Sequence, residues 1–187
     1  SRGLHILFAL AHEQLICFGP RHGKQPTFVM LEEWLPPRRG SLTREESLGQ
    51  LAGRYLRGHG PAGPADLAWW AGLTPKEAKE ALAIAGAPEI PAARTRRVHL
   101  LPAFDEYTVA YRDRSAVVDA AFAKKVNAGG GMINAIVVID GLVAGTWKRT
   151  FHGPSVDVKV TAFRALTERE RRGVDSAIAR YTRFLGR

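Results

Sequence analysis

The stretch from Thr43 to Gly86 constrains the fold most, because it repeats the signals with which helices begin and end. Thr43 with Glu46, and Thr74 with Glu77, have the spacing of a capping box, in which two side chains satisfy free backbone amides. Glycines and prolines separate the segments. Apolar residues recur at helical spacing, as at Leu48, Leu51, Ala52, Tyr55 and Leu56. The pattern predicts three short helices with a helix-turn-helix core, although an ordinary three-helix unit has the same pattern.

The composition of the chain restricts the class of partner and the compartment that we expect for it. Its 187 residues suffice for one or two domains, and the net charge of +9 favours an anionic partner, most often nucleic acid, although a merely basic protein would look the same. The single cysteine, Cys17, excludes an internal disulfide framework and fits a reducing cytosol. No apolar run approaches the ~20 residues of a membrane span, and no signal peptide is visible. We therefore expect a cytoplasmic, nucleoid-associated protein that does not contact a membrane.

The first 35 residues have the pattern of the end of a winged helix. A predicted helix over 2–15 precedes two short strand-like runs at 15–18 and 27–31, and the loop between them is basic. Such a wing would place Arg21, His22 and Lys24 along a phosphate backbone, whereas a plain surface hairpin would only solvate these charges. Residues 32–40 have the composition of a linker.

The second half predicts a small β module. Strands are expected at 98–101 and 108–111, a helix at 115–126, and three clear strands at 132–140, 142–151 and 156–163. Asp140-Gly141 predicts a tight type I′ turn between the first two of these three strands. A capping box at Thr167 and Glu170 starts a last helix with an apolar stripe.

The fold class is therefore α+β, with winged helix-turn-helix units followed by a small antiparallel β meander and a C-terminal helix. We expect the end of one winged-helix unit at 1–35, a complete one at 43–100, and the β module with its C-terminal helix at 101–187.

Few residues have the spacing of a catalytic or metal site. The six histidines are scattered, so we expect no metal and no cofactor, and Gly129-Gly130-Gly131 is expected to be a flexible connector. Asp105, Glu106 and Asp113 could act as acids or bases if buried, but a salt-bridge network around Asp113, with Arg112 and Arg114, fits better. Only one ring of Trp69-Trp70 can face fully inward, which leaves the other for base stacking.

Three blocks of sequence, at 54–73, 100–114 and 133–150, together resemble the bacterial winged-helix DNA-binding family that includes the AlkZ-like DNA glycosylases. The resemblance implies tandem winged helices, a β module and a basic concave surface for double-stranded DNA, with this chain as the C-terminal half. Glycosylases of the family carry a Gln-x-Gln or Gln-x-Asp motif in their N-terminal part. None of Gln14, Gln25 and Gln50 has Gln or Asp two residues later, so no catalytic residue is assigned and enzyme activity stays open. The resemblance also implies that Lys148 and Arg149, on a hairpin, lie close to DNA.

These observations favour a DNA-binding protein that grips duplex DNA through basic wings and a β hairpin. The alternative is the DNA-binding half of an AlkZ-like DNA glycosylase acting on alkylated or crosslinked bases, and the third is a protein-interaction domain. The charges of the helix at 75–85 cancel, which favours recognition of phosphates and DNA shape over base readout. The candidate DNA contacts are Arg21, His22, Lys24, Lys76, Lys79, Arg94, Arg96, Arg97, Lys148 and Arg149.

Overall fold

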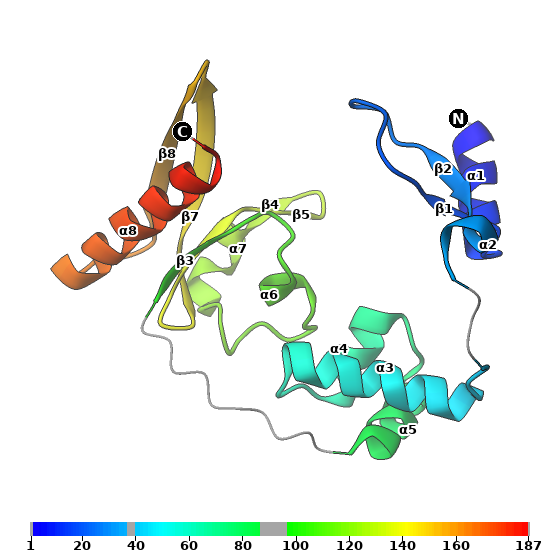
Figure 1. The fold of residues 1–187 in the computed structure, drawn as a ribbon. Helices are drawn as coiled ribbons and strands as arrows, with labels where there is room; N and C mark the ends of the chain where they lie inside the picture. Colours follow the sequence, from blue (N-terminus) through cyan, green and yellow to red (C-terminus); the bar gives the residue numbers. More distant parts are fainter. Residues whose placement is uncertain (1, 37–39, 87–96, 187) are drawn as a thin grey trace. The chain divides into compact units, whose positions relative to one another are not determined.

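The computed structural model describes residues 2–36, 40–86 and 97–186 and divides into two compact units, Ser1–Thr43 and Arg44–Arg187. The elements of the first unit are α1 (Arg2–His12), β1 (Ile16–Phe18), β2 (Phe28–Met30) and α2 (Leu31–Trp34) (Figure 1). The two strands pair antiparallel, with Cys17 opposite Val29. Helix α1 is shorter than the predicted 2–15 because Gln14 has a left-handed φ of 59°. The prediction of a linker from residue 32 onward is wrong at its start, because residues 32–34 belong to helix α2.

Three helices open the second unit, namely α3 (Arg44–His59), α4 (Pro64–Ala71) and α5 (Pro75–Ala85). Their buried core contains Leu48, Ala52, Tyr55, Leu56, Leu67, Ala78 and Ala81. The capping box at Thr74 is present, since its hydroxyl accepts from the Glu77 amide while Glu77 accepts from the Thr74 amide. Gly72 makes the turn between α4 and α5 with a φ of 67°, which is costly for a residue with a Cβ. The three predicted helices are therefore confirmed.

A four-stranded antiparallel sheet follows, in the order β3 (Val98–Leu101), β6 (Ile136–Ile139), β7 (Leu142–His152) and β8 (Ser155–Ala162). The predicted three-strand meander thus gains β3 as an edge strand. Asp140 and Gly141, with φ values of 50° and 87°, make the tight turn expected between β6 and β7. Helix α8 (Glu168–Phe184) covers one face of the sheet, with Val174 and Ala177 buried against Val98, Val137 and Trp147 (Figure 1).

Short elements pack on the other face. They are α6 (Glu106–Val109), the 3-10 helix η1 (Ala120–Phe122), α7 (Ala123–Val126), β4 (Asn127–Gly129) and β5 (Met132–Ile133). The strand predicted at 108–111 is wrong, because Asp105 caps a helical turn by accepting from the Tyr107 amide. The helix predicted at 115–126 is formed only from residue 120 onward, and the strand predicted at 132–140 is split into β5 and β6. The three glycines at 129–131, all with positive φ, form the β4–β5 turn and are not a free connector.

Hydrogen bonds join the three helices to the segment after β3. The Tyr55 hydroxyl, at the buried centre of α3, donates to the Ala110 carbonyl at 3.1 Å. The Tyr111 hydroxyl donates to the His59 carbonyl, and the Arg112 amide donates to the Asp66 carboxylate at 3.0 Å. Burial raises the pKa of the Tyr55 hydroxyl further above neutral pH, where it is a neutral hydrogen-bond donor. These contacts fix the helical core against the segment that carries Phe104 to Arg114.

Candidate nucleic-acid interface

The β7–β8 hairpin carries three exposed cations, Lys148, Arg149 and Lys159. From Trp147 onward β7 pairs with β8 and no longer with β6, so this part of the hairpin extends past the other two strands (Figure 1). Lys148 lies directly opposite Lys159, and both side chains are exposed. Like charges at such paired positions destabilise a sheet. An anion bound between them would remove this repulsion, which makes the pair a candidate phosphate contact.

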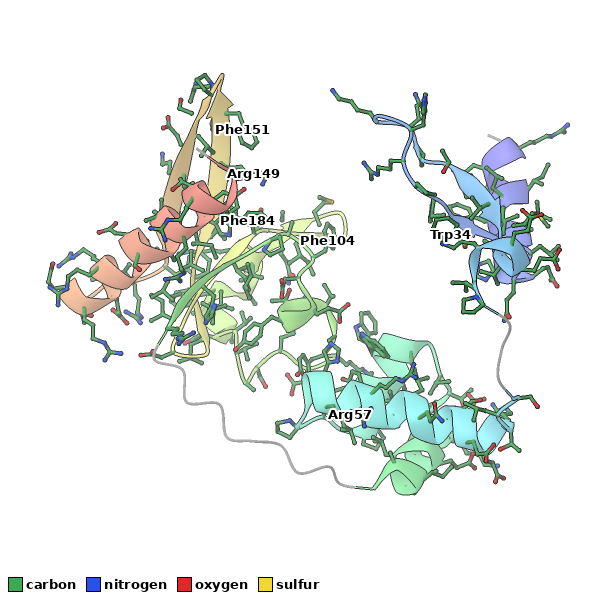
Figure 2. All side chains as sticks on the ribbon, viewed as in Figure 1. Trp34, Arg57, Phe104, Arg149, Phe151 and Phe184 are labelled. Carbon is green, nitrogen blue, oxygen red and sulfur yellow. The ribbon has the colours of Figure 1, made fainter. Side chains whose placement is uncertain are left out.

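Arg149 lies on the opposite face of β7 from Lys148, because successive side chains of a strand alternate. Its guanidinium is 5.3 Å from the centre of the Phe151 ring and 5.9 Å from that of Tyr181, and it donates to the Tyr181 hydroxyl (Figure 2). The two residues that the sequence predicted as neighbouring contacts therefore face different surroundings. Lys159, which the sequence analysis missed, is the partner of Lys148. The register that follows from a two-residue turn at Gly153-Pro154 is the signal that could have found it.

One of the two cations predicted on α5 pairs within its own helix. Lys76 lies one turn from Glu80, with Nζ and Oε1 3.9 Å apart, and Lys79 is exposed. The third charged neighbour, Glu77, accepts from Arg44 of α3. The DNA contacts predicted for Lys76 and Lys79 stay predictions.

The remaining predicted contacts lie in loops. Arg21, His22 and Lys24 are exposed between β1 and β2, where His22 pairs with Gln25, and belong to the first unit. Arg97 is exposed immediately before β3, whereas Arg94 and Arg96 lie outside the described residues. The DNA contacts assigned to all these cations stay predictions.

The acidic residues of the 105–113 segment organise the backbone. Asp105 accepts from the Tyr107 amide and Asp113 from the Ser115 amide, each at 2.9 Å. The amide and hydroxyl of Ser115 lower the pKa of Asp113 below its usual range. The salt-bridge network predicted around Asp113 is wrong for the described chain, since its carboxylate caps this turn and Arg114 reaches Asn127 at 3.4 Å. The Asp113 carboxylate binds the Ser115 amide in preference to an arginine because this amide is held only two residues away.

A cavity of about 370 Å³ lies between the end of α3 and the segment around α6. At its wall one carboxylate oxygen of Glu106 accepts from Trp70 Nε1 at 2.9 Å and lies 3.1 Å from His59 Nε2. The Tyr107 hydroxyl donates to the Gly141 carbonyl at 2.6 Å, and burial raises the pKa of Tyr107. The polar groups that surround the cavity are thus engaged with one another, which fits a structural joint between helices and sheet.

Within residues 2–36, 40–86 and 97–186 no group of three or more His, Cys, Asp or Glu side chains is placed to hold a metal ion. None of the helices in the described chain combines the length and apolar character needed to traverse a bilayer.

A family model and a solved structure both match the chain. A family model described as DNA glycosylase AlkZ-like matches residues 2–184. Among solved structures, the DNA glycosylase AlkZ of Streptomyces sahachiroi is similar, with a TM-score of 0.64 and 21% sequence identity. The match covers 92% of this chain and 52% of that protein, so the chain spans about half of its length. No curated protein matches the chain.

Proposed function

The chain belongs to the AlkZ-like DNA glycosylase family, and on that premise we propose that it forms the DNA-binding part of a glycosylase that acts on damaged bases in duplex DNA. The match over residues 2–184 is the observation that carries this proposal. It favours the glycosylase over the non-catalytic DNA-binding protein that the charge and motifs first suggested. Alkylated or crosslinked bases are the proposed substrates.

The charge distribution supports duplex DNA as the partner. The net charge is +9, and Lys148 and Lys159 place two positive charges side by side on an exposed strand surface. Contacts to phosphates fix the position of a protein without reading the bases, so these lysines would position the protein on the duplex. Recognition of the damaged base then requires that the base leave the stack, as in other enzymes that act on a base within a duplex.

The second candidate is DNA binding without base release by this chain. It is favoured by the three glutamines, Gln14, Gln25 and Gln50, none of which is followed two residues later by Gln or Asp. The 187-residue chain should therefore bind duplex DNA without releasing alkylated bases. A single-turnover assay for abasic sites, on duplexes carrying alkylated guanine, checks this; accumulation of abasic sites would assign catalysis to residues of this chain.

Binding is tested with a fluorescently labelled duplex in an anisotropy titration over a range of salt concentrations. If about 4–6 phosphates are contacted, the logarithm of the affinity should fall with the logarithm of the salt concentration with a slope of about −4 to −5. No binding at low salt, or tight binding that salt leaves unchanged, would remove nucleic acid as the partner.

A further inference from the structure

Trp69 is an exposed aromatic ring held in a fixed position. Its neighbour Trp70 packs toward the helical core, with its ring centre 5.0 Å from that of Tyr55, which confirms that only one of the two rings faces inward. Trp69 is 58% exposed, yet its Nε1 donates to the Val109 carbonyl at 3.0 Å. Hydrophobic packing alone does not explain an indole that is anchored by its edge while its surface is left open to solvent.

Trp69 lines a groove of about 430 Å³ in the second unit. The groove has Phe104 and Val109 on one segment and Asn127 to Ile133, with the β4–β5 turn, on another. Two of these side chains, Phe104 and Met132, are exposed large apolar residues, and Figure 2 shows Phe104 beside the β4–β5 hairpin. The groove therefore collects apolar and aromatic surface that the folded unit does not cover.

Phe104 has an unusual backbone conformation. Its φ is +58°, a region that residues with a Cβ rarely occupy, and its ring remains 48% exposed. Strained backbone persists where the surrounding structure compensates for it, and such positions cluster at binding sites.

Arg114 supplies a positive charge to the same groove. Its Nη1 donates to the Asn127 side chain at 3.4 Å, whereas Nε is buried and has no hydrogen-bond partner among the described residues. A buried donor without a partner is rare in folded proteins, because desolvation is not compensated. Arg114 lines the groove and makes no ion pair among the described residues, so its positive charge is available to attract a phosphate that enters the groove.

We propose that Trp69, Phe104 and Arg114 form a subsite for one unpaired nucleotide of bound DNA, with its base stacked on the aromatic rings and its phosphate toward Arg114. Stacking on aromatic side chains tolerates any base, because every base presents a π face. A groove that bound only apolar groups would gain nothing from a positive charge, whereas Arg114 suits a ligand that carries a phosphate. The proposal rests on the proposed function, since it presupposes that the chain binds DNA.

The test compares two duplexes with the same number of base pairs, one fully paired and one with a single bulged thymine that adds one phosphate, in anisotropy titrations with the whole 187-residue chain. We expect the bulged duplex to bind about tenfold more tightly, the size of one base–aromatic stack. Trp69→Ala should abolish most of this preference, and Trp69→Phe, which keeps a ring but loses the Nε1 donor, should keep most of it. The bulged thymine should also be protected from permanganate oxidation by the wild-type chain and not by Trp69→Ala.

Trp34→Ala is the matched control, because Trp34 is 52% exposed and lies in the other unit, outside the groove. It should leave the preference unchanged, and thermal melting of every variant checks that it is folded. Equal affinity for both duplexes, or a Trp69→Ala variant with an unchanged preference, would show that the subsite is wrong while the proposed function stands. A chain that binds neither duplex would overturn the proposed function and the subsite with it.

Discussion

Replacing Lys159 by glutamate should change stability and DNA binding in opposite directions. Lys159 pairs directly with Lys148 across β7 and β8, and both side chains are exposed. Lys159→Glu turns a repulsive cross-strand pair into an attractive one, so the folded state gains stability. The same change removes a positive charge from the surface that we propose contacts phosphate, so duplex binding weakens.

Both magnitudes follow from the position of the pair. Cross-strand charge pairs contribute about 0.2–1 kcal/mol, so we expect the free energy of unfolding to rise by about that amount. Each phosphate contact contributes about 0.9 to the salt slope, so losing one contact at 0.1 M salt lowers the affinity about eightfold. The new negative charge repels the backbone, and the loss should therefore exceed that of Lys159→Gln.

Urea unfolding followed by circular dichroism measures the first effect, and anisotropy titrations with a paired duplex at several salt concentrations measure the second. Arg54→Gln is the control, because Arg54 is an exposed cation on α3 that is not among the predicted DNA contacts. It should leave the affinity almost unchanged. A more stable Lys159→Glu variant that binds duplex as tightly as the wild type would refute the phosphate contact, and a less stable one would refute the repulsion between the two lysines.

Three further outcomes are expected. Arg164, and then the Thr167 amide, lower the pKa of Glu170 to about 2. The stability that these contacts provide is thus complete above the ordinary carboxyl pKa of about 4.5 and lost as the pH falls toward 2, and Glu170→Gln should flatten the acid side of a melting-temperature profile. Gly145→Ala should destabilise the chain by roughly 1–3 kcal/mol in urea unfolding, because its Cβ would lie 2.6 Å from the Thr161 carbonyl oxygen. Arg149→Ala should lower the melting temperature more than Lys148→Ala does, since Arg149 packs on Phe151 and Tyr181.

The helices and the tight turn could be predicted because their signals are local. The capping boxes at Thr74 and Thr167 form as the sequence indicates, and Asp140-Gly141 makes the turn between β6 and β7. A capping box needs only residues three apart, and a type I′ turn needs only two adjacent residues that tolerate positive φ. Nothing distant in the chain has to be known for either.

The errors occur where distant contacts decide the conformation. Residues 108–111 read as a strand, but Asp105 caps the turn before them and the Tyr107 hydroxyl ties it to Gly141. Strand β3 joins the sheet by pairing with β6, 35 or more residues later. Such tertiary contacts override the local preference for strand, which depends strongly on context.

The candidate site was predictable in residue type but not in arrangement. Basic residues on a hairpin were expected, yet the register of the two strands decides which of them share a face. The register places Lys159, and not Arg149, beside Lys148. The groove of Trp69, Phe104 and Arg114 combines three segments and a backbone angle that no local pattern specifies. One ring of Trp69-Trp70 was a candidate for base stacking, but which ring is exposed and what surrounds it only follow from the fold.

The hairpin and the groove would contribute to DNA binding in physically different ways, and salt separates them. Phosphate contacts at Lys148 and Lys159 weaken as the salt concentration rises, because the counterions that binding releases from DNA then enter a more concentrated solution. This effect is equal for paired and bulged duplexes. Stacking on Trp69 and Phe104 buries apolar surface of the base against the aromatic rings. Counterions affect this contribution to the binding free energy little. Raising the salt concentration therefore lowers both affinities, and the ratio between them falls only through the one phosphate contact at Arg114. Binding strength would then come mainly from the strand surface, and preference for an unpaired base from the groove.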